Sequence, residues 1–177
     1  MKRIWLVLFF SLLYSQLWAQ EESGSSEEFH RHKVMIVLGH THVANGFNSK
    51  GDKAWIVLPS WGLDYDFRLN ANWSIGLHSE MVIESFEYES ENQIKLDRTR
   101  PVALVVVGSR KIGKHLTILA GGGTELAPEE NLTLIRVGAD YSWELINNWE
   151  LAVNVMTDFK LDAYDSWVFG LGVAKIF

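Results

Sequence analysis

Apolar and polar residues alternate with a period of two from Lys33 to the C-terminus, which is the repeat of β-strands with one apolar face. The alternation is clear in most segments, but the first and fourth segments are too irregular to show which side chains face inward. The pattern predicts eight strands: Val34–Val43, Ala54–Leu69, Trp73–Tyr88, Arg100–Arg110, Leu116–Leu126, Leu132–Leu145, Trp149–Lys160 and Ser166–Phe177.

The breaks between these strands alternate in length. The short turns are Asn70–Asn72, Lys111–His115 and Ile146–Asn148, and the longer or intermediate breaks are Ala44–Lys53, Glu89–Thr99, Ala127–Asn131 and Leu161–Asp165. Short turns at one end and longer loops at the other, with an even number of strands, are typical of transmembrane β-barrels. The sequence therefore predicts an all-β fold, an antiparallel up-and-down transmembrane β-barrel with both termini at the short-turn end.

Large aromatic side chains decide which face of the predicted barrel points outward. The chain has eight Trp, nine Phe and five Tyr, and many of them share the apolar face, among them Trp55, Trp61, Trp73, Trp143 and Phe169. An eight-stranded barrel encloses only enough space for ordinary side chains. These rings are therefore predicted to face lipid, with girdles near the strand ends. The alternative is a soluble lipocalin-like carrier, whose apolar face lines the interior.

The N-terminus has the layout of a secretory signal peptide: Lys2 and Arg3, an apolar run, and a cleavage site after Ala19. The predicted domains are a signal peptide (1–19), a flexible, acidic N-terminal tail (20–32) and an outer-membrane β-barrel (33–177). The chain has no Cys, which excludes disulfides and thiolate metal sites. Its net charge of −6 argues against nucleic acid as a partner.

The C-terminal residues Gly172-Val173-Ala174-Lys175-Ile176-Phe177 combine alternating apolar residues, an upstream Gly172 and a final Phe177. From Lys33 onward the chain resembles the small outer-membrane β-barrel proteins of the OmpX, OmpW and OmpA-barrel kind, and its last residues resemble their assembly signal. Lys175 departs from the usual apolar residue. The resemblance implies a location in the outer membrane, with outer-membrane lipid and the assembly machinery as partners.

Charged and polar residues on the opposite face of the strands are predicted to fill the lumen as a network of ion pairs and hydrogen bonds. Glu125 belongs with them, and Arg100 and Arg110 are further candidates. An excess of acids also permits a narrow, cation-preferring pore. The predicted network is Asp64, Asp66, Arg68, His78, Glu80, Glu84, Arg136, Asp140, Glu144, Glu150 and Asp158.

Histidines in the first and third predicted strands suggest a weaker, second kind of site. His40 and His42 share one face of a strand, and His78 and Glu80 lie on a strand that runs in the same direction. Two imidazoles and a carboxylate are a possible metal-ligand set. The alternatives are hydrogen bonding in the lumen or positions at the rim, and no cofactor is predicted.

Four functions are compatible with the sequence. The first is a structural or interaction protein with a filled lumen, whose extracellular loops meet a partner through an acidic rim that includes Glu84, Glu87, Glu89 and Glu91. The second is a narrow porin-like channel for small solutes. The third is an envelope-modifying enzyme that uses His40, His42, His78 and Glu80, and the fourth is the soluble carrier.

Overall fold

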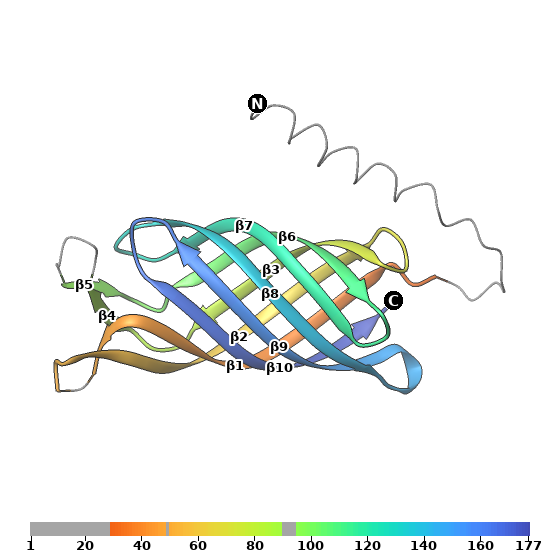
Figure 1. Cartoon of the computed structure of the whole chain (residues 1–177), viewed down its shortest axis with the longest axis horizontal. Coiled ribbons are helices and arrows are strands. Elements are labelled where there is room, and N and C mark those ends of the chain that lie inside the picture. The colour runs from red at the N-terminus through yellow and green to blue at the C-terminus, as the bar shows by residue number, and fades with distance from the viewer. Residues whose placement is uncertain (1–28, 49, 90–94) are drawn as a thin grey trace, which may run out of the picture.

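The computed structural model describes residues 29–48, 50–89 and 95–177, so the predicted signal peptide and most of the predicted tail lie outside the described residues. Eight strands close into a barrel in which each strand pairs with its neighbours in antiparallel fashion and β10 pairs with β1 (Figure 1). The barrel strands are β1 (His32–Phe47), β2 (Lys53–Arg68), β3 (Trp73–Val82), β6 (Val102–Ile112), β7 (Leu116–Leu126), β8 (Leu132–Glu144), β9 (Trp149–Lys160) and β10 (Asp165–Ile176).

A small hairpin lies at one end of the barrel. It consists of β4 (Phe86–Glu89) and β5 (Lys95–Arg98), and it joins the sheet where Tyr88 pairs with Gly46 of β1. The prediction of a single strand over Trp73–Tyr88 was therefore wrong, because the chain bends after Val82. The bend buries Phe86 and Tyr88, whose rings would stand in water if β3 continued straight.

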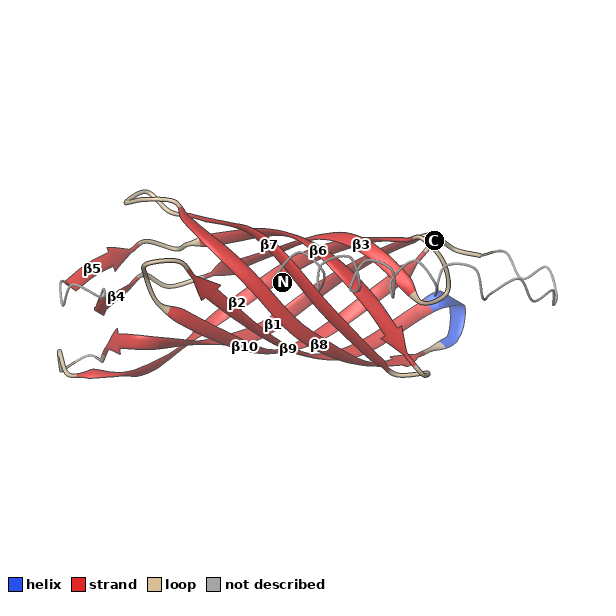
Figure 2. Ribbon diagram, turned by 45° about the horizontal axis from the view of Figure 1, so that its top comes forward, coloured by secondary structure: helices blue, strands red, loops and turns tan. Residues whose placement is uncertain are grey.

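The short turns, the start of β1 at His32 and the C-terminus lie at the opposite end, as Figure 2 shows for the C-terminus and the 3-10 turn η1 (Ile146–Asn148). Gly113, Asn147 and Asn148 have positive φ angles, which Gly and Asn adopt most readily in tight turns. His32 and Phe177 exchange backbone hydrogen bonds of 3.2 and 2.7 Å and close the seam. We call this the short-turn end and the other the long-connection end. The predicted barrel and the grouping of its termini are confirmed.

The outer wall of the barrel is apolar. Leu38 is 68% exposed and Trp55 60%, while residues of the opposite parity on the same strands, such as Met35 and Leu58, point inward and are buried. The first and fourth predicted strands, which the sequence left unassigned, follow the same rule: Ile36 and Val106 face out. In a soluble carrier the apolar face would line the interior, so the arrangement is the one predicted for a membrane barrel. Within the described residues, we find no helix of the length and apolarity needed to cross a membrane.

The two residues of the predicted assembly signal take different positions on β10. Phe177 is 58% exposed at the short-turn end. Gly172 faces the lumen, where a Cβ atom would lie 2.7 Å from the sulfur of Met35. A side chain at this position would therefore force Met35 to move. Whether these residues act as an assembly signal stays a prediction.

Candidate functional site

Arg136 lies at the centre of the lumen and binds carboxylates from two other strands. Its Nε and Nη2 donate to both oxygens of Asp158 on β9, at 2.6 and 2.7 Å, and Nη2 also donates to Glu80 on β3 at 3.0 Å. Thr41 of β1 donates to the second oxygen of Glu80 at 2.6 Å. The two hydrogen bonds to Asp158 form a bidentate, charge-assisted pair. Because Arg136 is only 2% exposed, this pair is largely removed from water. We call these four residues the Arg136 cluster.

A second buried cluster lies between the Arg136 cluster and the long-connection end. Glu125 of β7 accepts hydrogen bonds from Arg98 of β5 and from the hydroxyl of Tyr164, at 2.8 and 2.9 Å to its two oxygens. Lys160 lies 3.4 Å from Glu125 and donates to Ser166 at 2.6 Å. One carboxylate therefore joins the β4–β5 hairpin to the barrel, and we call this set the Glu125 cluster.

The rings of the hairpin cover the Glu125 cluster. Tyr164 packs edge-on against Phe86, with ring centroids 5.4 Å apart, and against Tyr88 at 4.7 Å. Burial, and then the charge of Glu125, raise the pKa of Tyr164 well above its ordinary value. Its phenol therefore stays protonated and donates to Glu125 at any physiological pH. The apolar residues of this cover are Val43, Leu58, Val82, Phe86, Tyr88, Leu132 and Tyr164.

The half of the lumen nearer the short-turn end is acidic. His78 of β3 lies between two carboxylates of β2: its Nε2 is 3.2 Å from Asp66, and its Nδ1 is 3.8 Å from Asp64. The second distance is too long for a hydrogen bond, and Nδ1 has no other hydrogen-bond partner. All three side chains are buried.

Two polar pairs from other strands complete this half of the lumen. The side-chain nitrogen of Asn154 on β9 donates to Asp140 of β8 at 2.6 Å, while the side-chain oxygen Oδ1 of Asn154 is buried without a hydrogen-bond partner. Lys33 of β1 forms an ion pair with Glu150 of β9. A cavity of about 60 Å³ lies among these side chains and is lined by Lys33, Asp66, His78, Asp140 and Glu150, among others.

Most residues of the predicted network line the lumen, but three do not belong to its interior. Glu84 is exposed in the bend between β3 and β4, so its assignment to the lumen is corrected. Arg68 and Glu144 lie at the short-turn rim, where Arg68 donates to the carbonyl of His30 and Glu144 pairs with Lys111 at 2.7 Å. Lumen positions hold Asp64, Asp66, His78, Glu80, Arg136, Asp140, Glu150 and Asp158.

The two arginines proposed as further lumen candidates are exposed. Arg100 follows β5 outside the barrel, and Arg110 points outward from β6 over the ring of Trp73. Sequence reasoning also missed several polar residues of the lumen. Lys160 has the same parity as Glu150 and Asp158 on its strand, so it was recognisable, whereas Arg98 had been placed in a loop. The missed residues are Lys33, Thr41, Arg98, Lys160 and Tyr164, whereas Asn154 and Ser166 have the inward parity but were left out of the predicted network.

The four candidate metal ligands do not come together. His40 and His42 face outward: His40 is exposed beside Phe169, and His42 stacks on Trp167 with ring centroids 3.8 Å apart. His78 and Glu80 point into the lumen. In the part of the chain that the structure describes, no three His, Asp or Glu side chains are grouped so as to hold a metal ion. The metal hypothesis fails because the first strand has the opposite facing from the one it required.

No family model and no curated protein matches the sequence. Among solved structures, the chain is similar to Ail, the attachment invasion locus protein of Yersinia pestis, with a TM-score of 0.52 and 16% identity over 82% of this chain and 99% of that one. The present chain therefore has the fold of a small outer-membrane β-barrel. Neisserial surface protein A gives the same TM-score, with 12% identity over 82% of this chain and 97% of that one. The predicted resemblance to such barrels is confirmed at the level of fold.

Proposed function

We propose that this outer-membrane barrel has a closed lumen and acts by binding a partner at its long-connection end. The single observation that carries the proposal is the Arg136 cluster, which bridges β1, β3, β8 and β9 across the lumen. The spaces found along the lumen measure about 60, 30 and 10 Å³. Roughly 10–15 Å³ is needed for one water molecule, so they hold a few waters but give no path for a solute.

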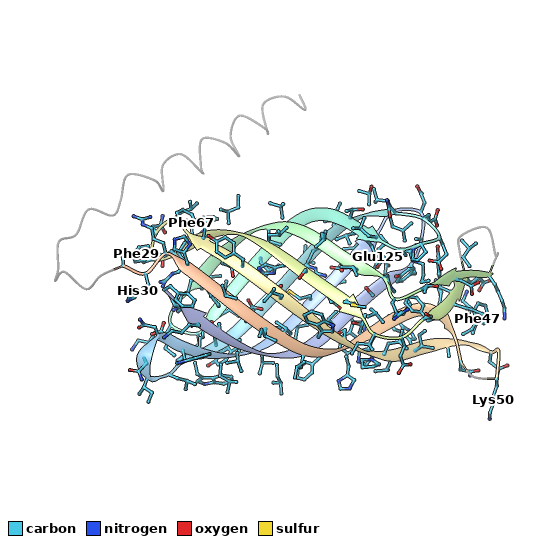
Figure 3. All side chains as sticks on the ribbon, turned by 180° about the vertical axis from the view of Figure 1, so that it is seen from behind. Phe29, His30, Phe47, Lys50, Phe67 and Glu125 are labelled. Carbon is cyan, nitrogen blue, oxygen red and sulfur yellow. The ribbon has the colours of Figure 1, made fainter. Side chains whose placement is uncertain are left out.

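The long-connection end is the part of the molecule that is built to meet a partner. In outer-membrane barrels, short turns face the periplasm and longer loops face the outside. The β1–β2 connection and the β4–β5 hairpin extend beyond the barrel there, and Figure 3 shows Lys50 and Phe47 at that end and Phe29 and His30 at the other. This placement supports an interaction role rather than transport.

The exposed surface at that end is acidic. Its basic side chains are partly neutralised, since Lys53 pairs with Glu89 at 2.6 Å and Lys95 lies 3.9 Å from Glu87. A hydrogen bond from Thr99 lowers the pKa of Glu129, which keeps that carboxylate charged. We call the following exposed residues the acidic surface: Glu84, Glu87, Asp97, Glu129, Glu130, Asp162 and Asp165.

The chemistry of the acidic surface favours a cationic partner. One solved structure of Ail is a complex with sucrose octasulfate, a heparin analogue and therefore a polyanion. An acidic surface repels a polyanion and attracts a basic polypeptide segment, because complementary potentials steer association and like charges oppose it. The shared fold therefore does not carry the same ligand preference to this protein.

Binding in nanodiscs of zwitterionic lipid tests this proposal. We expect the protein to bind polylysine in a salt-sensitive manner and not to bind heparin. The triple variant Glu129→Gln, Glu130→Gln, Asp162→Asn should bind polylysine about fivefold to tenfold more weakly, because each exposed charge contributes a few tenths of a kcal/mol. Glu144→Gln, an exposed acid at the opposite end, is the matched control and should bind like the wild type. Preference for heparin would contradict the proposal.

Conductance in planar bilayers tests the closed lumen against the alternative of a porin-like channel. We expect insertion of the protein to produce no steady single-channel steps, because Arg136 and its carboxylates occupy the middle of the lumen. Regular steps of uniform size in the wild-type protein would establish the channel instead. The variant Arg100→Gln, which alters an exposed arginine outside the lumen, should be equally silent.

A further inference from the structure

Buried charges in the lumen are balanced in one half and unbalanced in the other. From the Arg136 cluster to the long-connection end, three carboxylates (Glu80, Glu125 and Asp158) face three bases (Arg98, Arg136 and Lys160). Toward the short-turn end there are four buried carboxylates (Asp64, Asp66, Asp140 and Glu150), and within the described part of the chain their ion pairs are with Lys33 and His78. An uncompensated charge in a lumen enclosed by lipid costs several kcal/mol.

Arg136 lines the same cavity as Asp64, but it donates its hydrogen bonds to two other carboxylates, Glu80 and Asp158. The next nearest bases do not make up this deficit either. Lys111 lines the cavity of about 60 Å³ beside His78 but pairs with Glu144, and Arg68 lies over the ring of Phe29 and donates to His30. Both are therefore engaged at the rim rather than with the buried carboxylates. The excess negative charge needs a partner that is not a side chain of the described residues.

Two unpartnered polar atoms lie in the same acidic half. His78 and Asn154 are each 1% exposed, yet His78 Nδ1 and the side-chain oxygen of Asn154 have no hydrogen-bond partner. With Nε2 donating to Asp66, Nδ1 of a neutral imidazole is an acceptor, and it faces an acceptor oxygen of Asp64 at 3.8 Å. A cation about 2.4 Å from each atom, a typical metal–oxygen distance, spans such a gap. His78 lines the cavity of about 60 Å³, and Asp64 and Asn154 line one of about 30 Å³.

We propose that this half of the lumen binds a small monovalent cation of the Na⁺ or K⁺ class beside Asp64 and His78, with the side-chain oxygen of Asn154 and water completing its surroundings and Asp140 adding to the negative potential. The charge excess supplies the attraction, the unpartnered acceptors supply ligand atoms, and the cavity admits the accompanying water. A transition-metal ion is not the ligand, because the described residues do not group three His, Asp or Glu side chains around one point. The cation stabilises the folded lumen, and its binding is independent of the partner binding proposed for the long-connection end.

Thermal unfolding of the full-length barrel in detergent tests the site. The heat-induced shift in gel migration is followed at pH 8 while NaCl or KCl replaces N-methylglucamine chloride at constant ionic strength. We expect a saturable rise in the unfolding midpoint of about 2–4 °C with Na⁺ or K⁺. N-methylglucamine is too large for the cavity and should give no rise.

The variant Asp64→Asn should lose this dependence and unfold at a higher midpoint than the wild type in N-methylglucamine, because it removes excess buried charge. Asp140→Asn serves if that variant does not fold. Asp52→Asn, an exposed acid outside the lumen, should keep the wild-type response. Equal midpoints in all three salts would overturn the proposal, as would a cation response that survives both lumen substitutions. A midpoint that depends on pH alone would assign the missing charge to protons and would also overturn it.

Discussion

Arg136→Gln is expected to lower the free energy of unfolding by about 3–5 kcal/mol, the usual cost of removing one partner from a buried ion pair. The substitution leaves Glu80 and Asp158 facing each other without a base between them. Glutamine keeps much of the side-chain length, so the loss reports charge rather than volume. Urea-induced unfolding of the barrel in lipid vesicles, followed by tryptophan fluorescence, measures the change.

Two further variants make this result specific to the ion pair. Arg100→Gln alters an exposed arginine and should change stability by less than about 0.5 kcal/mol. Arg136→Gln combined with Asp158→Asn should be more stable than Arg136→Gln alone, because one uncompensated charge has been removed. If the double variant were as unstable as the sum of its two single variants, Arg136 and Asp158 would not act as a pair.

Alternation along the strands was sufficient to predict most of the barrel. β7 and β9 have the predicted bounds, and β8 differs by one residue. A side-chain period of two indicates both that a segment is a strand and which of its side chains point outward. Both properties could therefore be assigned in the long segments that alternate clearly. β1 and β6 lacked this signal because their inward positions carry apolar residues such as Met35 and Val105.

The bend after β3 shows where the sequence held a signal that was not used. Apolar residues occupy odd positions up to Ile83 and even positions at Phe86 and Tyr88. This move of the apolar residues to the other parity, across the exposed Glu84 and Ser85, is a signal of a bulge or a break in the strand. It separates β3 from β4 and moves Glu84 out of the lumen. The hairpin partner β5 had no comparable signal, because four residues give too little periodicity.

The partners within the lumen were beyond prediction from one sequence. Parity places Arg136, Asp158 and Glu80 on inward faces, but their heights depend on the stagger between strands. β3 and β9 are not neighbours in the sheet, so no turn between them fixes their relative register. The same uncertainty about facing and stagger led to the metal hypothesis, in which His40 was combined with His78.

The membrane environment of the outer wall leads to the second large expected effect. Val106→Arg should lower the free energy of unfolding from lipid vesicles by about 2–4 kcal/mol, because Val106 is 55% exposed in the middle of β6, where the wall meets the centre of the bilayer.

Ile112→Arg provides the matched control for that substitution. Ile112 is 47% exposed but lies at the end of the same strand, near the short-turn rim, so arginine there can extend its guanidinium to the interface at a cost of about 0–1 kcal/mol. In water both positions are exposed and should tolerate arginine equally, within about 0.5 kcal/mol. The difference between the two variants therefore measures depth in hydrocarbon, and equal stabilities in lipid would rule out a membrane-spanning wall at Val106.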